Sequence, residues 1–445
     1  MSRLADRKDM RESLMAFAGA RGSVVAALDL GASKVGCFIM RGDGARREDR
    51  SIHIAGVAHV QARGVRGGAI VNPEEAAQAI AQAVERAETM AGLAISGVIV
   101  TTAGGQMASH RVGVQVSLGS KPITDHDLSR ALQMALVQAR FPGRRPIHLL
   151  PIAWSVDGQR GLRDPRGAFG QALGLDLLVV TMNESAWQTL HHCTEMAHVQ
   201  LEGVVASPFA SGLAVLEEDE MDLGAICIDM GGGSTSTAVF TGGSLIHVDS
   251  LSVGGAHVTA DIARGLSTTL AGAERLKTLH GSAIASTKED REMIEAPARG
   301  DDPSAAPIVA PRSLLMGVIA PRVEETLELV RERLKASGAP LHPGAGVILT
   351  GGASSLTGIA QLATRVFDRP VRLGRPRRAP HLAEAASGPA FAAAAGVLHR
   401  AAFGPREAAR IRGDAAPSSP TPVTSQPARN EGPVGKVAGW LREHL

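Results

Sequence analysis

The chain has 445 residues, which is long enough for two or more domains with their own hydrophobic cores. Its net charge is +2, only 3% of its residues are aromatic and Tyr is absent, so we expect no nucleic-acid partner. Three widely spaced cysteines fit neither a zinc site nor a disulfide framework and favour a reduced, cytoplasmic protein. Residues 1–22 are charged throughout, unlike a secretory signal, and are expected to form a flexible arm.

The first predicted elements, over 23–104, alternate strands with a helix. Apolar stretches predict strands in "SVVAALDLG", "VGCFIM", "IHIAGVAHVQ" and "SGVIVTTAGG". Asn72 and Pro73 predict the start of a helix, because Asn caps helices well and Pro suits the first turn. This pattern is typical of an α/β domain, to which we also assign residues 179–222.

The pattern changes over 105–178. The strand-like "RVGVQVSLG" is followed by a predicted helix from about Thr124 to Arg140 and by the strand-like "PIHLLPIAWSVDG" and "LGLDLLVVTMN". The order strand, helix, strand, strand indicates a small α+β unit inserted in the first domain. A second domain is expected over 223–255 and 313–402. Residues 256–312 are expected to form a smaller subdomain, whose polar, Pro-rich stretch 281–312 predicts loops.

One short pattern occurs twice, as "LDLGASKV" at 28–35 and "IDMGGGST" at 228–235. In each copy an aspartate, Asp29 or Asp229, ends a strand and precedes a glycine turn with hydroxyl side chains. The N–H groups of such a turn can surround phosphate oxygens, and the carboxylate can hold water on Mg²⁺. A single copy would indicate only an ordinary hairpin, since Gly and Asp favour turns. Two copies favour a nucleoside triphosphate gripped between duplicated domains.

These stretches, with "VILTGGASSLTGI", resemble the phosphate-1, phosphate-2 and adenosine motifs of the actin-like ATPase superfamily. "SPFASGLAVL" and "SGPAFAAAAGVL" resemble its two connecting helices. Within the superfamily the chain is similar to the FtsA family of bacterial cell-division proteins, through "RGVRGGAIVNPEEA", "AERLKTLHG" and the long run that begins "DMGGGSTSTAVF". The resemblance implies an actin-like ATPase fold, with two duplicated domains around a nucleotide cleft and an inserted strand-helix-strand-strand (SHS2) subdomain.

The resemblance also implies ATP and Mg²⁺ as cofactors. Asp29 and Asp229 would orient magnesium-bound waters. Glu274 and Lys277, one helical turn apart, would reach the adenosine, and Gly351 and Gly352 would let the backbone approach base and ribose. The remaining contacts to phosphates and sugar fall on Gly31, Ser33, Lys34, Gly231, Gly232, Gly233, Ser234, Gly254 and Gly255.

Two positions depart from the superfamily pattern. Ala32 stands where relatives often have a hydroxyl, with Ser33 beside it as a substitute. Ser236 stands where many actin-like ATPases have a second Asp after the triple glycine. The lost carboxylate weakens the case for efficient hydrolysis. We therefore expect ATP binding with at most slow turnover, and we assign no catalytic residue.

Composition changes again after about residue 403. Residues 403–432 are rich in Pro, Ser and Thr, which predicts a disordered linker. In 433–445 a helical projection gathers the apolar residues on one face, with Trp440 at its border. A helix docked on its own protein is the commoner outcome, but the linker favours a membrane-surface anchor. Its membrane-facing residues would be Val434, Val437, Ala438, Trp440, Leu441 and Leu445.

The FtsA resemblance implies a peripheral protein on the cytoplasmic face of the inner membrane at the division site. It implies that the FtsZ C-terminal peptide binds on 256–312, that copies of the chain form filaments on anionic lipid, and that later division proteins such as FtsN are recruited. Two alternatives remain: a small-molecule kinase of the same superfamily, or a pilus-assembly relative of FtsA. A kinase has no use for the amphipathic C-terminal stretch, and the pilus-assembly relatives use other partners and lack such a tether.

Overall fold

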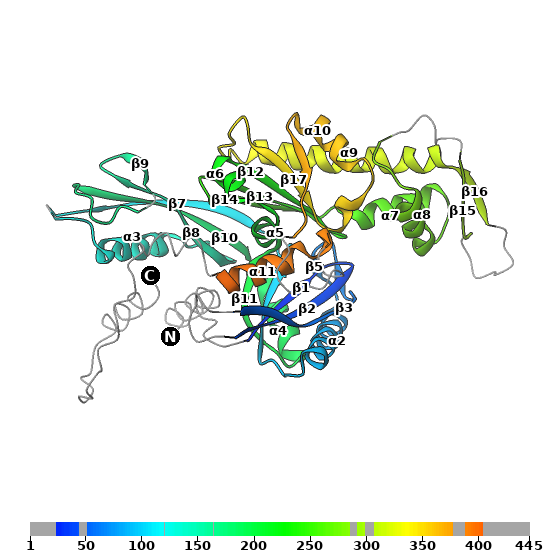
Figure 1. Cartoon of the computed structure of the whole chain (residues 1–445), viewed down its shortest axis with the longest axis horizontal. Coiled ribbons are helices and arrows are strands. Elements are labelled where there is room, and N and C mark those ends of the chain that lie inside the picture. The colour runs from blue at the N-terminus through cyan, green and yellow to red at the C-terminus, as the bar shows by residue number, and fades with distance from the viewer. Residues whose placement is uncertain are drawn as a thin grey trace.

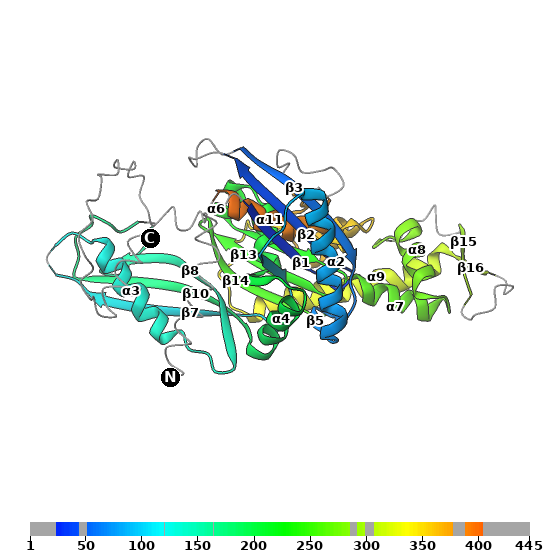
Figure 2. The same ribbon diagram turned by 90° about the horizontal axis from the view of Figure 1, so that it is seen from below.

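The computed structural model describes seven ranges of the chain: 24–43, 51–119, 121–162, 164–284, 292–298, 307–376 and 388–403. The expected N-terminal arm, the linker beyond 403 and the C-terminal helix with its six membrane-facing residues lie outside them. The described part is elongated (Figure 1). Two sheet domains lie in the middle, a strand-rich unit lies at one end and a small, mainly helical subdomain lies at the other, as the view turned by 90° also shows (Figure 2).

The sheet of the first domain has five strands in the order β11-β6-β1-β2-β3. They are β1 (Val24–Leu30), β2 (Lys34–Asp43), β3 (Ser51–Gln61), β6 (Gly97–Thr102) and β11 (Gln200–Ala206). The first three are antiparallel, whereas β6 and β11 run parallel to β1. Helix α2 (Pro73–Ala91) begins where the sequence predicted, since Asn72 Oδ1 accepts a hydrogen bond from the Glu75 N–H at 3.4 Å. The short pair β4 (Val65–Arg66) and β5 (Ala69–Ile70) precedes it, and α4 (Glu184–Met196) leads into β11.

The sheet of the second domain repeats this arrangement. Its order is β14-β13-β12-β17-β18, with β12 (Ala225–Met230), β13 (Thr235–Thr241), β14 (Ser244–Leu251), β17 (Gly346–Thr350) and β18 (Val371–Leu373). Again three antiparallel strands are followed by two parallel ones. Helices α9 (Arg312–Ala336) and α10 (Ile359–Phe367) accompany it, with the short helices α6 (Glu218–Leu223) and η1 (Gly352–Ser355). The expected duplication is therefore confirmed.

Two helices cross between the sheets. Helix α5 (Ser207–Val215) follows β11, and α11 (Ala392–Phe403) follows the short turn η3 (Pro389–Phe391). They approach so closely that a Cβ on Gly396 would lie 1.7 Å from the carbonyl oxygen of Ala210. The small-residue composition of both helices permits this contact, because no side chain separates the backbones. The two helices thereby join the two domains.

The inserted unit contains β7 (Ala108–Ser117), α3 (Asp125–Gln138), β8 (Arg144–Val156), β9 (Gln159–Leu162) and β10 (Ala172–Asn183), with the sheet order β7-β10-β8-β9. Its own core includes Leu128, Trp154 and Leu173. The unit also contacts the second domain, because Ser109 Oγ donates to the Val248 carbonyl at 2.9 Å and accepts from the Val248 N–H at 2.7 Å. The strand-helix-strand-strand expectation is confirmed, with β9 as a short addition.

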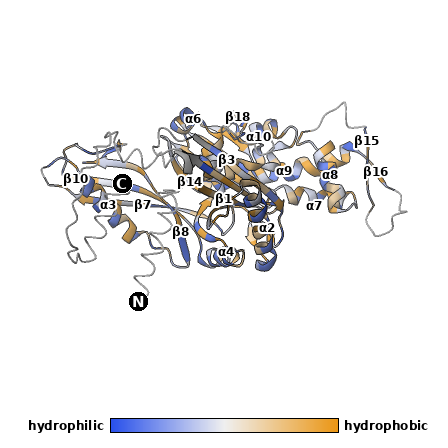
Figure 3. Cartoon of the chain, turned by 60° about the horizontal axis from the view of Figure 1, so that its bottom comes forward, coloured by the Kyte–Doolittle hydropathy of each residue, from blue (hydrophilic) through white to orange (hydrophobic). Residues whose placement is uncertain are grey.

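The small subdomain holds α7 (Gly255–Gly265), α8 (Leu270–His280) and a hairpin of β15 (Met293–Ala296) and β16 (Ile308–Pro311). Our expectation of loops alone over its polar, Pro-rich end was wrong. Ile294, Ala296 and Ala310 are buried in the hairpin and alternate with exposed residues. Each strand has only four residues, so this alternation is too brief to be recognised within a polar, Pro-rich sequence. In Figure 3 the central strands are predominantly orange, which matches the buried cores of the two sheet domains. Within the described ranges, no helix combines the length and apolar character needed to cross a membrane.

Candidate nucleotide site

The repeated motif forms the same turn in both domains. Asp29 lies near the end of β1 and Asp229 near the end of β12. In the first copy the Gly31 N–H donates to the Lys34 carbonyl at 3.1 Å, and in the second the Gly231 N–H donates to the Ser234 carbonyl at 2.8 Å. The two hairpins therefore present equivalent backbone groups to the space between the domains.

Strand register places a threonine beside each aspartate. Asp29 pairs with Thr101 of β6, and Asp229 pairs with Thr350 of β17. The two environments then differ. Thr101 Oγ1 donates to Asp29 Oδ1 at 2.9 Å, whereas Asp229 Oδ2 accepts at 2.6 Å from Ser211 Oγ on α5. Both carboxylates are thus held in fixed orientations, the second by one of the crossing helices.

A cavity of about 140 Å³ lies between the two turns. It is smaller than the roughly 300–1,000 Å³ of common ligand pockets, so a whole nucleotide requires the domains to separate somewhat. The tips of the turns nearly touch, since a Cβ on Gly233 would lie 2.5 Å from Ala32 Cβ. The expected residues that line the cavity are Asp29, Gly31, Ser33, Lys34, Asp229, Gly231, Gly232, Gly233, Ser234, Gly351 and Gly352.

Gly351 has a specific reason to be glycine. Its φ is +86°, and a Cβ there would lie 2.3 Å from Asp229 Oδ1. The adenosine motif therefore approaches the second aspartate directly, which only a residue without a side chain allows.

The other expected residues do not line this cavity. Gly254 and Gly255 lie behind the second turn, where the Gly255 N–H donates to the Gly231 carbonyl at 3.0 Å. Lys277 Nζ contacts Glu274 Oε2 at 2.6 Å and the Gly255 carbonyl at 3.1 Å. In this closed arrangement Glu274 and Lys277 therefore support the second turn from behind.

The sequence did not single out several residues of the site. Thr101 could have been found, because "IVTT" ends a strand parallel to the one that carries Asp29. Ser211 and Ala390 could not, because only tertiary packing brings them to the cleft. Lys34 Nζ donates to the Ala390 carbonyl at 2.6 Å and lies 3.1 Å from the centroid of the Phe391 ring.

Burial dominates the electrostatics of the site. It raises the pKa of Asp29, against the opposing Lys34 charge and the Thr101 hydrogen bond. It raises the pKa of Asp229 to about 6, helped by the Asp29 charge and opposed by Ser211 and Lys34. It lowers the pKa of Lys34 to about 8, although both aspartates oppose this. Two carboxylates and a lysine share a poorly solvated space, and a bound cation would favour the ionised carboxylates.

These residues fit a magnesium-bound triphosphate. Mg²⁺ in proteins commonly takes one or two carboxylates, waters and substrate phosphates, and glycine turns supply N–H donors to phosphate oxygens. Asp29 and Asp229 are the carboxylates among the residues that line the cavity, and Ser236 lines it where a further acid would stand. The bound group would supply the phosphates and the cation. The residues of the chain would bind and orient it.

The duplicated sheets, the crossing helices and the paired acidic turns define a protein of the actin-like ATPase fold. Two family models match the chain: "Cell division protein FtsA" over residues 226–396 and "SHS2 domain inserted in FTSA" over 104–181. The chain is 42% identical over 385 residues to Cell division protein FtsA of Rhizobium meliloti, covering 85% of this chain and 87% of the relative. It is 39% identical over 429 residues to that of Agrobacterium fabrum, covering 95% of each. The chain belongs to the FtsA family of cell-division proteins.

Comparison with solved structures supports the fold. The chain is similar to a chain of the PilM-PilN type IV pilus biogenesis complex, with a TM-score of 0.60 and 19% identity, over 86% of this chain and 100% of the other. It is also similar to MreB5 of Spiroplasma citri bound to ADP, with a TM-score of 0.50 and 15% identity, over 85% of this chain and 95% of the other. At these identities the likeness concerns the fold alone.

Proposed function

We propose that this chain is an ATP-binding division protein that tethers FtsZ to the cytoplasmic face of the inner membrane, polymerises there and recruits later division proteins such as FtsN. The observation that carries the nucleotide part is the pair Asp29 and Asp229, which end equivalent strands of the two domains and face one cavity. Their glycine turns hold the phosphates, and the carboxylates hold Mg²⁺ through water. With Ser236 in place of an acid, hydrolysis is at most slow.

The FtsZ C-terminal peptide is proposed to bind the small subdomain. Large apolar side chains are exposed there on three neighbouring elements: Leu270 and Leu279 on α8, Met293 on β15 and Val309 on β16. Leu270 and Leu279 are 64% and 62% exposed. Exposed apolar residues are a common basis for peptide binding, because their burial provides the driving force.

Filaments and the membrane anchor are proposed to depend on each other. The stretch 433–445, outside the described residues, has too few apolar side chains for tight binding by one copy. Linking many copies raises the effective concentration of each anchor at the membrane. Exposed apolar residues of the insert, among them Val137 and Phe169, are available for contacts between copies.

Co-sedimentation with anionic liposomes tests this proposal. The full-length chain is mixed with FtsZ and ATP, and FtsZ without its C-terminal peptide serves as the matched control. FtsZ should pellet with the liposomes only when the chain is present and the FtsZ peptide is intact. A kinase or a pilus-assembly protein would leave FtsZ in the supernatant in every mixture, and that result would overturn the tethering function.

A further inference from the structure

The outer edge of the first sheet is the long strand β3, which helix α2 approaches closely at Gly56 and Val57. β3 is the last strand of its sheet, and its outer side pairs with no strand in the part of the chain that the structure describes. Its 11 residues, "SIHIAGVAHVQ", contain no Lys, Arg, Asp, Glu or Pro. Natural edge strands are usually short, charged or interrupted by Pro, because a bare edge pairs readily with another chain. Beyond Val57 this edge is suited to accept a further strand.

Two hydrogen bonds show which backbone groups of β3 point outward. The Ala62 N–H donates to the Ser33 carbonyl at 3.1 Å, so this N–H group points toward the β2 side of the strand. Inward and outward N–H groups alternate in an antiparallel ladder, which directs those of His59 and Gln61 outward. The Val57 N–H agrees with this phase, since it donates away from β2 to Met90 Sδ at 3.3 Å. A thioether is a weak acceptor, so even this group is poorly satisfied.

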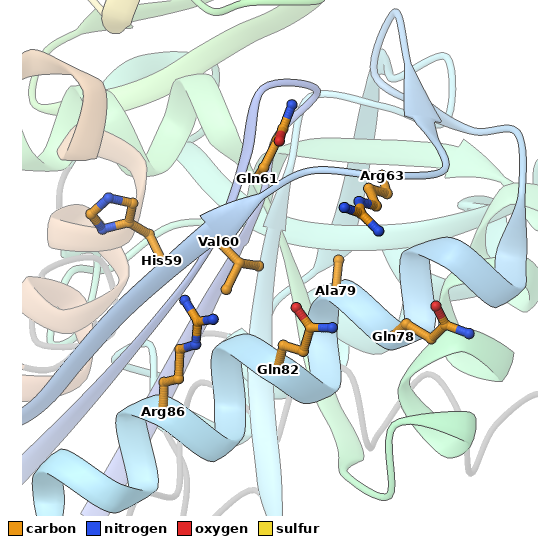
Figure 4. A pocket seen from close by; sticks show the side chains of 8 residues that line it. All are labelled: His59, Val60, Gln61, Arg63, Gln78, Ala79, Gln82 and Arg86. Carbon is orange, nitrogen blue, oxygen red and sulfur yellow. The ribbon is translucent and has the colours of Figure 1, made fainter.

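A cavity of about 300 Å³ adjoins the same end of the strand. Figure 4 shows it between β3 and α2, with Gln82 and Arg86 extending from the helix toward the strand and Arg63 beyond the strand end. None of the described residues that line it carries a carboxylate. Among the described residues, neither Arg63 nor Arg86 has an ion-pair or side-chain hydrogen-bond partner. Within the described ranges, the cavity thus combines two guanidinium groups that lack such partners with the outward N–H groups of His59 and Gln61.

We propose that the β3 edge and this cavity together dock an extended, acidic peptide segment of another protein. The segment adds to the sheet as a further strand, through the outward groups of His59 and Gln61, as in β-augmentation. Its acidic side chains pair with Arg63 and Arg86, whose planar guanidinium groups match carboxylates in two-point contacts. Glutamine amides of α2 offer both donors and acceptors to the same segment. This surface lies in the first domain, apart from α8, β15 and β16 (Figure 2).

The test uses fluorescence anisotropy with the full-length chain and a labelled peptide of about nine residues, a usual strand length, that alternates Val and Glu. We expect saturable binding. The double variant Arg63→Glu/Arg86→Glu should weaken it about tenfold or more, because both contacts become repulsive. The variant Arg140→Glu/Arg160→Glu, with the same charge change at exposed residues of the insert, should bind as the wild type does. A peptide with Lys in place of Glu should bind the wild type weakly.

Several results would overturn the proposal. If the wild type and Arg63→Glu/Arg86→Glu bind the Glu peptide with equal affinity, the two arginines do not contact its acidic side chains. If a peptide with a central Pro binds as tightly as the Val/Glu peptide, the peptide does not pair with β3 as a strand, because Pro cannot donate to the ladder. Full competition by free glutamate or inorganic phosphate at peptide concentrations indicates a small-anion pocket instead. Self-association of the chain that is lost in Arg63→Glu/Arg86→Glu, without peptide binding, indicates a contact between copies. The peptide comparisons use the wild-type chain, so they remain decisive if a variant misfolds.

Discussion

Lys34 Nζ donates a hydrogen bond of 2.6 Å to the carbonyl oxygen of Ala390. Lys34 belongs to the first phosphate turn, and Ala390 belongs to η3, which leads into the crossing helix α11. The ammonium group also lies over the Phe391 ring. The first hairpin is therefore tied to the segment before α11 at the point where the cleft closes, and a bound phosphate would compete with the Ala390 carbonyl for the same ammonium group.

Replacing Lys34 by Ala should lower the affinity for Mg-ATP about tenfold or more, because a charge-assisted hydrogen bond to phosphate is lost. Isothermal titration calorimetry measures the effect. Lys277→Ala is the control, since Lys277 supports the second turn from behind and does not line the cavity. A larger loss of Mg-ATP affinity in Lys277→Ala than in Lys34→Ala would contradict this, because Lys277 would then contact the bound nucleotide more strongly than Lys34 does.

Asp229 should make nucleotide binding depend on pH. Its pKa is raised to about 6 by burial, so the carboxylate is protonated as the pH falls through that value. Only the ionised form holds a cation, and affinity for Mg-ATP should therefore decline from neutral pH to about 5. Titrations at a series of pH values check this. In Asp229→Asn the weak remaining affinity should vary less with pH around 6 than that of the wild type does.

The same carboxylate should destabilise the nucleotide-free chain at neutral pH. Its folded pKa lies above the unfolded value of about 4, so the folded state binds the proton more tightly and stability rises as the pH falls from about 6 to about 4. Asp229→Asn should remove this dependence and raise the free energy of unfolding at neutral pH by up to about 3 kcal/mol. Urea denaturation measures it. A destabilised variant with an unchanged pH profile would contradict the assignment.

Much of this architecture could be predicted from the chain itself. The duplicated turns at Asp29 and Asp229 have a local signature, namely an apolar strand, an acid and glycines, and the structure places both at one cavity. The contacts that orient them could not be predicted. Ser211 and Ala390 meet the turns only because α5 and α11 cross, a tertiary relation without local signal. The hairpin of β15 and β16 was missed because its strands are only four residues each.

The crossing of α5 and α11 should tolerate no added side chain. In Gly396→Ala the new Cβ would lie 1.7 Å from the Ala210 carbonyl oxygen, so the helices must shift and stability should fall by about 2 kcal/mol or more. Gly317→Ala is a matched control inside α9, where a Cβ meets nothing within 4 Å. It should raise stability by about 0.5–1 kcal/mol through helix propensity. Thermal unfolding of both variants measures these changes. If both variants are stabilised or both are destabilised, the proposed close packing of α5 and α11 is contradicted.

Deleting 433–445 should separate membrane binding from nucleotide binding. The truncated chain should bind Mg-ATP with the affinity of the full chain, because the stretch lies outside the cavity-forming segments. It should no longer pellet with anionic liposomes. Trp440→Ala/Leu441→Ala is a milder variant that should reduce pelleting without changing chain length. Unchanged pelleting of the truncated chain would show that the amphipathic stretch is not the anchor.

The most direct test of the account is a calorimetric titration of the full-length chain with ATP, with and without Mg²⁺. We expect saturable, magnesium-dependent binding that Asp29→Asn/Asp229→Asn abolishes. Glu324→Lys/Glu328→Lys, which changes two exposed acids of α9, should leave binding unaltered. An absence of adenine-nucleotide binding in the wild type, or equal binding in the Asp29→Asn/Asp229→Asn variant, would contradict it.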